Sequence, residues 1–134
     1  MEYMLDTDTS IFVMEEITAA AKKFKKTLLK NKKVYISSIT LAELEYGVYR
    51  NSNYEANRNK VTNFLKLIPV LLFDNSAAMY YGIEKAKLAK ANKTLKEQDL
   101  FIGSHALSKK CILVTNNEKD FKKIKDLKIE NWTL

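Results

Sequence analysis

The sequence predicts one α/β domain spanning residues 1–134, with a central, mostly parallel sheet of four or five strands and helices on both faces. Its length suits a single core, and 46% hydrophobic residues exclude a disordered chain. Short apolar runs rich in β-branched residues alternate with longer segments of helical periodicity, as in parallel sheets. Three Gly and one Pro are too few for the tight turns of an all-β fold.

The N-terminal third begins this alternation of strands and helices. Residues 3–5 are an apolar run that ends at acidic residues, which predicts a buried first strand. Residues 10–14 are a short apolar helix candidate. Residues 17–29 predict an amphipathic helix whose apolar residues, Ile17 among them, recur every three or four positions. Residues 34–39 are rich in β-branched side chains and predict the second strand.

The middle of the chain continues with helix, helix and strand. A helix is expected to begin at Thr40, because Thr40-x-x-Glu43 matches a capping box in which the glutamate reaches back to a free backbone N–H. Residues 57–68 show helical spacing until Pro69, and residues 70–73 predict the third strand. The capping box therefore offers a purely structural role for Glu43.

The C-terminal half repeats the pattern. Asp74 or Ser76 can cap a long helix that runs to about residue 92. Thr94-x-x-Glu97 is a second capping-box match and opens the next helix. The remaining expected elements are a helix over 95–108, a strand over 111–115, a helical turn over 120–124 and an edge strand over 129–132.

The charge balance favours a polyanionic partner. Lys and Arg number 23 against 16 Asp and Glu, which gives a net charge of +7. Only Arg50 and Arg58 are arginines, so bidentate reading of guanine in DNA is disfavoured, whereas lysines suit a phosphate backbone. The densest lysine runs, 22–33 and 119–128, also fit solvated helix faces.

Several classes of site and location are disfavoured. The single cysteine, Cys111, excludes internal disulfides, and no cluster of cysteine and histidine indicates zinc. No Ser-His-Asp or Cys-His pattern indicates a nucleophile, and the lone histidine, His105, is expected to be packed in the core. Neither a signal peptide nor a long apolar run is present, so we expect a cytoplasmic protein without a membrane span.

Acidic residues stand at element boundaries, and this is the strongest chemical signal. Asp99 shares a helical face with Ile102 and Ala106, and a core-facing carboxylate needs a partner or a metal. Two carboxylates about 4 Å apart repel by roughly 4 kcal/mol at an effective dielectric near 20, so converging acids need a cation such as Mg²⁺ or Mn²⁺. Helical periodicity does not decide whether Glu43 or Glu45 points inward. The boundary positions are Asp6, Asp8, Glu43, Glu45, Asp99, Asn116, Asn117 and Asp120.

One alternative arises from the first motif. The segment DTDTS at residues 6–10 is similar to the D-x-D-x-T/S motif of haloacid dehalogenase-type phosphatases. Those enzymes also need a late acidic pair, and none follows the third expected strand.

Ordered motifs along nearly the whole chain resemble a different family. They are MLDTD at 4–8, SITLAELEYG at 38–47, YGI at 81–83, QDL at 98–100 with HAL at 105–107, VTNN at 114–117 with DF at 120–121, and IENW at 129–132. On these motifs the chain resembles the PIN-domain ribonuclease toxins of the VapC family. The segments TLAELEYG, VTNN and ENW are similar to the branch of initiator tRNA(fMet)-specific endonucleases.

The resemblance implies a metal-dependent active site. It places Asp6 at the first metal-binding acid, Glu43 at the acid of the A-E-L motif, and Asp99 at the acid of the M-D-x-x-I segment. Asp6 and Asp99 would be the main Mg²⁺ ligands, with Mn²⁺ as a possible substitute, and Glu43 would be a ligand or a base beside the metal.

The motifs also depart from the family pattern at two places. Asp8 stands where Asn is more usual, and Asn117 occupies the position of a fourth acid. Asp120 is the alternative for that fourth role.

The resemblance further implies what the protein does and with whom. We expect the toxin of a type II toxin–antitoxin system, an endoribonuclease that cleaves RNA, specifically the anticodon loop of initiator tRNA(fMet). Its expected partners are a VapB-type antitoxin and a second copy of the toxin in a homodimer. A small phosphatase and a non-catalytic PIN-like RNA-binding domain are the alternatives.

Overall fold

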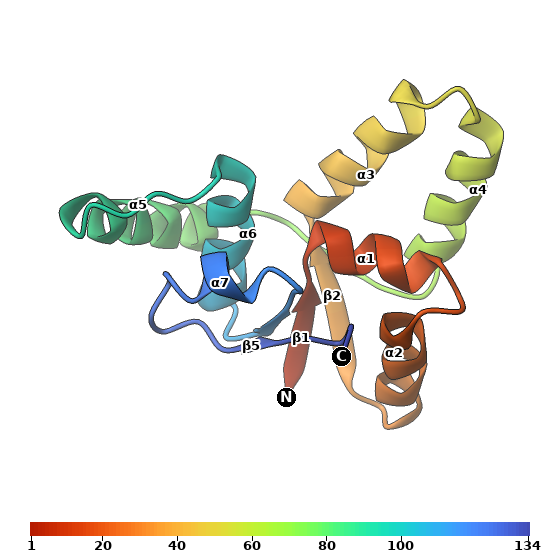
Figure 1. The fold of residues 1–134 in the computed structure, drawn as a ribbon, viewed down its shortest axis with the longest axis horizontal. Coiled ribbons are helices and arrows are strands. Elements are labelled where there is room, and N and C mark those ends of the chain that lie inside the picture. The colour runs from red at the N-terminus through yellow and green to blue at the C-terminus, as the bar shows by residue number, and fades with distance from the viewer.

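Five parallel strands form the central sheet of the computed structural model, which describes residues 1–134 (Figure 1). The strands lie in the order β3-β2-β1-β4-β5, so the first strand of the chain is the central one. This confirms the expected sheet, here with every neighbouring pair parallel. The strands are β1 (Glu2–Leu5), β2 (Lys33–Ser37), β3 (Val70–Leu71), β4 (Ile112–Val114) and β5 (Ile129–Glu130).

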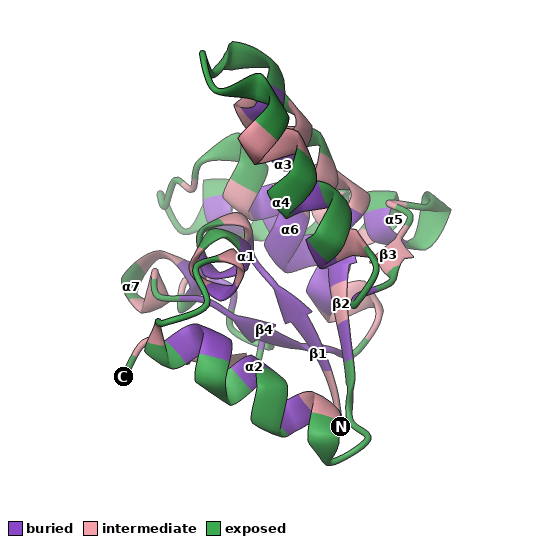
Figure 2. Ribbon diagram, turned by 90° about the vertical axis from the view of Figure 1, so that its right-hand side faces the viewer, coloured by how far each residue is buried: buried purple, intermediate pink, exposed green.

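Helices cover both faces of this sheet, as the sequence predicts. They are α1 (Thr7–Met14), α2 (Ala19–Leu29), α3 (Ser38–Arg50), α4 (Tyr54–Leu65), α5 (Asn75–Lys90), α6 (Glu97–Ser108) and α7 (Glu118–Phe121). Figure 2 shows the buried strands β1 and β4 with helices on either side of them. No helix is both long enough and apolar enough to traverse a lipid bilayer.

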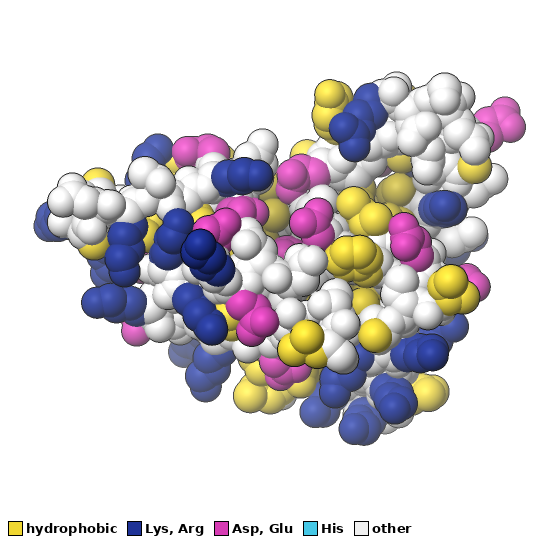
Figure 3. All heavy atoms as spheres, in the orientation of Figure 1, with side chains coloured by type: hydrophobic (Ala, Val, Ile, Leu, Met, Phe, Trp, Pro, Cys, Tyr) yellow, Lys and Arg dark blue, Asp and Glu magenta, His cyan; other side chains and the backbone are white.

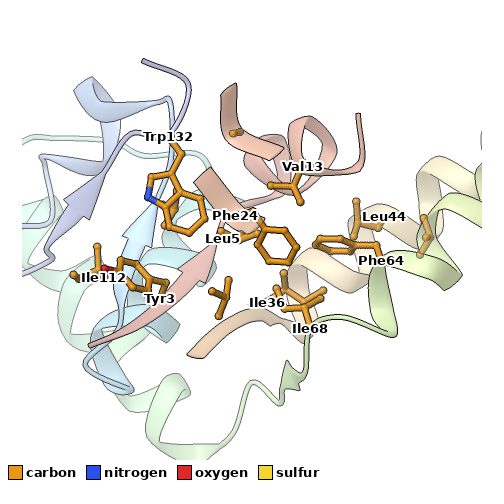
Figure 4. Packing of buried hydrophobic residues seen from close by; sticks show 14 of the residues in the cluster. Tyr3, Leu5, Val13, Phe24, Ile36, Leu44, Phe64, Ile68, Ile112 and Trp132 are labelled. Atoms are coloured by element: carbon orange, nitrogen blue, oxygen red, sulfur yellow. The ribbon is translucent and has the colours of Figure 1, made fainter. Parts of the chain in front are cut away.

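Alternating side chains of β1 separate two hydrophobic clusters. Tyr3 and Leu5 point into the larger cluster, which α1 to α4 cover and which also holds Phe24 and Phe64 (Figure 4). Met4 points to the other face and packs in a second cluster under α5, α6 and α7. This alternation is the period of two that a strand imposes on its side chains, and it explains why both faces of the short strand are buried.

The strand register brings three carboxyl ends to one edge of the sheet. Leu5 pairs with Ile36 of β2 and with Val114 of β4. The next residue of each strand, Asp6, Ser37 and Thr115, therefore lies at this edge, where open α/β sheets place their ligand sites.

Both predicted capping boxes are wrong. Helix α3 begins earlier than expected, because the hydroxyl of Ser37 accepts from the backbone N–H of Ile39 and takes the capping role. Thr40 is inside the helix and fully buried. Helix α6 begins at Glu97 with Lys96 at its cap position, which has no side-chain capping bond. Glu43 is thus free of the structural role that the capping box offered it.

Other element boundaries shift for similar local reasons. Thr18 caps α2, so Ile17 lies before the helix and is 90% exposed instead of packing in the core. Helix α4 begins at Tyr54, three residues before the expected start, and β3 has only two residues. Asp74 does cap α5, accepting from the N–H of Ala77 at 3.0 Å, as one of the two predicted candidates.

Gly103 permits a close approach that holds α6 against the C-terminal segment. A Cβ placed there would lie 2.6 Å from Cδ1 of Ile124 and 3.3 Å from the ring of Phe121. We expect Gly103→Ala to lower the free energy of unfolding by about 1–3 kcal/mol, because the core must shift to accept the methyl group.

The matched control for this substitution is Gly82→Ala on α5, where a Cβ would meet nothing within 4 Å. It is expected to be neutral or to stabilise the chain by up to about 1 kcal/mol through helix propensity. Urea unfolding of both variants decides the point. Equal effects would contradict the close contact at Gly103.

Candidate active site

Asp6 lies at the carboxyl end of β1 and caps α1. Its carboxylate oxygen Oδ1 accepts from the backbone N–H of Thr9 at 2.8 Å, and the residue is only 5% exposed. Burial raises the pKa of Asp6, although hydrogen bonds from Thr115 and Thr9 oppose this shift. The helix cap therefore fixes a buried carboxylate at the edge where the strands end.

Glu43 faces the same edge from α3. Its Oε1 accepts a hydrogen bond from the hydroxyl of Thr7 at 2.5 Å, and Thr7 also lies 3.3 Å from the hydroxyl of Thr40. Glu45, which periodicity left as the alternative, instead forms an ion pair with Arg58 of α4. The structure thus places Glu43 beside the residue that follows Asp6, and Glu45 away from it.

Asp99 lies in the first turn of α6, where the charges of other acids affect its pKa. Its pKa is raised to about 6, first by burial and then by the negative charges of Asp6, Asp120 and Glu43, while Lys96 opposes the shift. Burial alone raises a carboxyl pKa, whereas the part of the shift that comes from negative charge requires other carboxylates close by. The four acids therefore share one electrostatic site, although they come from four different helices or helix ends.

Asn117 connects two of these acids. Its side-chain amide Nδ2 lies 3.0 Å from Oδ2 of Asp120 and 3.4 Å from Oδ2 of Asp99. The hydrogen bond from Asn117 is the main cause that lowers the pKa of Asp120, and Lys123 adds to it from 3.3 Å. Asn117 thus donates between two carboxylates and favours the charged form of Asp120.

Two threonines also belong to this site, and sequence reasoning missed both. Thr7 donates to Glu43, and the buried Thr115 hydrogen-bonds to Asp6 and accepts at its hydroxyl from the N–H of Asn117 at 2.9 Å. Thr7 directly follows Asp6, which caps α1, and Thr115 directly follows Val114, the last residue of β4. Their position at a strand end, beside the predicted acids, was the sequence signal that could have identified them.

His105 and Cys111 lie outside the site, as expected. His105 is fully buried, with Nδ1 2.8 Å from the hydroxyl of Ser37, and burial lowers its pKa to about 4. Burial raises the pKa of the Cys111 thiol to about 11. The histidine is therefore neutral and the cysteine protonated at neutral pH, and neither reaches the acids.

A groove of about 820 Å³ adjoins the acids. It runs between α1, α3 and α4, and Gln98 and Phe101 of α6 also line it. Glu43, Tyr46 and Arg50, which follow one side of α3, line it together with the exposed Asp8. Figure 3 shows acidic side chains around the hollow between α6 and α3, with lysine and arginine side chains on both sides.

The donor set suits a small, hard divalent cation. Carboxylate and hydroxyl oxygens surround the site, without imidazole or thiolate. No three acidic, histidine or cysteine side chains are already arranged as a metal site. Mg²⁺ commonly needs only one or two carboxylates and keeps several waters. Asp6 and Asp99 fit this role, since Asp6 exerts the largest charge effect on Asp99.

Comparison with known proteins identifies the family. The PIN domain model matches residues 3–127. The chain is 37% identical to ribonuclease VapC2 of Rickettsia felis over 98% of both chains. This chain belongs to the VapC family of PIN-domain ribonucleases. It is also 34% identical to the tRNA(fMet)-specific endonuclease VapC of Shigella flexneri over 99% of both chains.

The fold of the VapC family is confirmed by solved structures. The crystal structure of VapBC2 from Rickettsia felis bound to a promoter DNA fragment matches with a TM-score of 0.91 at 36% identity, covering 98% of this chain and 99% of the other. The VapC membership excludes the dehalogenase-type phosphatase and makes the chain an endoribonuclease. PIN-domain ribonucleases generally depend on a divalent metal ion.

Proposed function

We propose that this endoribonuclease hydrolyses RNA with Mg²⁺ held by Asp6 and Asp99, and with Glu43 as a further ligand or as the base. The observation that carries the proposal is a set of hydrogen bonds at the carboxyl edge of the sheet: Thr7, next to Asp6, donates to Glu43, and the amide of Asn117 lies within 3.4 Å of both Asp99 and Asp120. Mn²⁺ is the expected substitute, because it accepts the same oxygen ligands. Asn117 and Asp120 complete the site as hydrogen-bonding partners.

The residues of the chain prepare this site before substrate arrives. Bound Mg²⁺ would lower the pKa of a water and offset charge on the phosphate. The cap of α1 fixes the Asp6 carboxylate, and the Thr7 hydroxyl orients Glu43. Asn117 holds Asp120 beside Asp99 through its amide. These bonds limit the rotation of each carboxylate, so little reorganisation is needed at the reacting phosphate.

The groove next to Glu43 suits unpaired bases. Tyr46 is 66% exposed, and the guanidinium of Arg50 lies 5.3 Å from the centre of its ring. Exposed aromatic rings and arginine planes are stacking surfaces for bases that have left a duplex. We therefore propose a single-stranded RNA loop as substrate, specifically the anticodon loop of initiator tRNA(fMet). The name of the Shigella relative states tRNA(fMet) as its substrate.

Replacing Tyr46 tests the stacking role. Tyr46→Ala is expected to slow cleavage of a loop substrate by about 5- to 100-fold, since base stacking on an aromatic ring contributes about 1–3 kcal/mol. Tyr49→Ala is the matched control, because Tyr49 is equally exposed at 69% but does not line the groove. Cleavage rates on a stem-loop RNA measure both. An equal loss in the two variants would contradict stacking at Tyr46.

Cleavage of total RNA tests the activity and its specificity together. Purified protein is incubated with total cellular RNA, once with Mg²⁺ and once with EDTA, and the new 5′ ends are mapped. We expect Mg²⁺-dependent cuts in the anticodon loop of initiator tRNA, with 5′-phosphate and 3′-hydroxyl ends. The proposed place of action is the cytoplasm, where tRNA serves translation. Cleavage in EDTA, or cyclic phosphate ends, would contradict the metal-dependent mechanism.

The proposed partners are a VapB-type antitoxin and a second copy of the chain. An apolar groove of about 550 Å³ lies between α1, α2 and α4, lined in part by Phe24, Leu28 and Phe64. It suits the apolar face of a partner helix.

Co-expression with the neighbouring gene tests this assembly. We expect the chain alone to be toxic and dimeric, and the neighbouring product to bind it and stop RNA cleavage. A harmless monomer that the neighbouring product neither binds nor inhibits would refute the toxin–antitoxin proposal, while leaving the nuclease proposal standing.

A further inference from the structure

Two lysine-rich surfaces of the chain differ in their relation to the active site. The first, the α2 surface, is formed by Lys22, Lys23, Lys25, Lys26 and Lys30. The second, the α5–α7 pocket, lies between the end of α5 and the segment around α7. Its lysines are Lys87, Lys90, Lys93, Lys123 and Lys125. Figure 3 shows dark blue side chains gathered in both regions, on opposite sides of the central acids.

The α5–α7 pocket is a hollow of about 460 Å³ with unbalanced positive charge. Its five lysines face only two acids, Glu84 and Asp126. Lys87 pairs with both of these acids, at 3.3 Å and 3.9 Å. Lys90, Lys93 and Lys125 form no ion pair. Three ammonium groups around this hollow are therefore available to an anion.

A continuous set of side-chain contacts joins this pocket to the catalytic acids. Lys123, which lines the pocket, lies 3.3 Å from Oδ1 of Asp120 and donates to the backbone carbonyl of Thr94 at 2.9 Å. Asp120 is bonded to Asn117, which also reaches Asp99. One residue thus belongs to both the pocket and the edge of the active site.

The α2 surface has no such connection. Helix α2 lies beside the strands rather than at their carboxyl ends (Figure 1). Three of its lysines, Lys22, Lys23 and Lys26, line a small hollow with the C-terminal segment, residues 130–134, and none of the catalytic acids lines that hollow. The two lysine runs look alike in the sequence, but the structure joins only the second to the active site.

Helix electrostatics alone does not explain the pocket. Lys87 and Lys90 stand in the last turn of α5, where the helix dipole favours cations. Lys93 lies in the loop that follows α5, whereas Lys123 and Lys125 come from the segment after α7. Lysines from three separate segments converge on one hollow, although like charges brought together repel. Their convergence therefore requires a reason other than the helix dipole.

We propose that the α5–α7 pocket binds a backbone phosphate of the substrate RNA, one that flanks the phosphate being cleaved. This proposal rests on the proposed ribonuclease function and specifies the path of the bound RNA. From the catalytic acids the RNA strand runs across Lys123 and α7, not across α2. Lysine ammonium groups act as point charges that hold a phosphate without reading the base. The pocket contributes affinity and position, and the groove beside Glu43 contributes the selection of bases.

The test compares two charge reversals of equal size. Lys93→Glu/Lys125→Glu changes the pocket, and Lys22→Glu/Lys26→Glu changes the α2 surface. Both are made in an Asp99→Asn background that should not cleave, and binding to initiator tRNA is measured from low to high salt. We expect the pocket variant to bind at least tenfold more weakly. The slope of log binding constant against log salt concentration should become shallower by about one unit, since each phosphate contact contributes about 0.7–0.9 units. The α2 variant should stay within about twofold.

Each remaining outcome overturns something specific. Equal losses in the two double variants would show that general charge, not the pocket, attracts RNA, and would refute this proposal while leaving the proposed function intact. Weaker binding of the partner protein with unchanged RNA binding would also refute it. A wild-type chain that does not cleave RNA would refute the proposed function itself. Thermal unfolding confirms that each variant is folded before binding is compared.

Discussion

Asp99→Asn is expected to abolish RNA cleavage and to make the metal-free chain more stable. The substitution removes a proposed Mg²⁺ ligand, so we expect the cleavage rate to fall by a factor on the order of 10² or more. It also removes a half-buried charge that Asp6, Asp120 and Glu43 repel. After allowance for partial exposure to solvent, the gain in unfolding free energy at neutral pH is about 1–2 kcal/mol.

The pH dependence gives this gain a clear signature. The pKa of Asp99 is about 6 in the folded chain against 3.8 for the free residue. Between these values the folded chain holds more protons than the unfolded chain, so its stability falls as the pH rises from about 4 to 6. The difference between Asp99→Asn and wild type should therefore grow over this window and then level off. Urea unfolding in EDTA measures it.

Glu55→Gln is the control, since Glu55 is an exposed acid in the first turn of α4 that lines neither groove nor the α5–α7 pocket. It should leave cleavage near wild type. Asp6→Asn should also abolish cleavage and stay folded, because Asn replaces Asp well at a helix cap. Wild-type cleavage by both Asp6→Asn and Asp99→Asn in Mg²⁺ would overturn the metal-site proposal.

Glu43→Gln is expected to cause the second large loss, at least about tenfold in cleavage rate. Gln keeps the size of the side chain and can still accept from the Thr7 hydroxyl, so the geometry is retained while the charge is lost. A loss of activity without a loss of stability would separate a chemical role from a structural one. Single-turnover cleavage of a short RNA, with thermal unfolding in parallel, gives both quantities.

Glu45→Gln provides the comparison within the same helix. Glu45 pairs with Arg58 between α3 and α4, and this partly exposed pair is screened by solvent and contributes little to stability. We expect a small change in stability and nearly unchanged cleavage. If Glu45→Gln reduced cleavage more than Glu43→Gln, the assignment of Glu43 to the active site would be wrong.

The sequence predicted the fold well wherever hydrophobic periodicity was strong. The buried strand before Asp6, the parallel sheet and Asp74 as one of two cap candidates all follow from patterns of three to ten residues. Helix starts were less predictable, because several Ser and Thr residues compete to cap each helix. Ser37 caps α3 in place of Thr40 because Ser37 ends a strand whose register is fixed by tertiary pairing. Local sequence does not contain that information.

The candidate site, too, was predictable from the sequence only in part. Asp6 and Asp99 could be singled out because a carboxylate at a strand end or on an apolar helix face is unusual. The choice of Glu43 over Glu45 needed the family resemblance, and the structure supports it through Thr7. The amide of Asn117 between Asp99 and Asp120 depends on how α6 packs against α7, which no local pattern encodes.

The central position of β1 has a consequence for synthesis on the ribosome. β1 is made first, yet one of its two neighbours is β4, near the end of the chain. Pairing of strands so distant in sequence delays folding until the late segment has emerged. Thr115, Asn117 and Asp120 follow β4 directly, so the nascent chain lacks a complete active site until translation is almost finished. The enzyme is thereby kept inactive while it is still attached to the translation machinery.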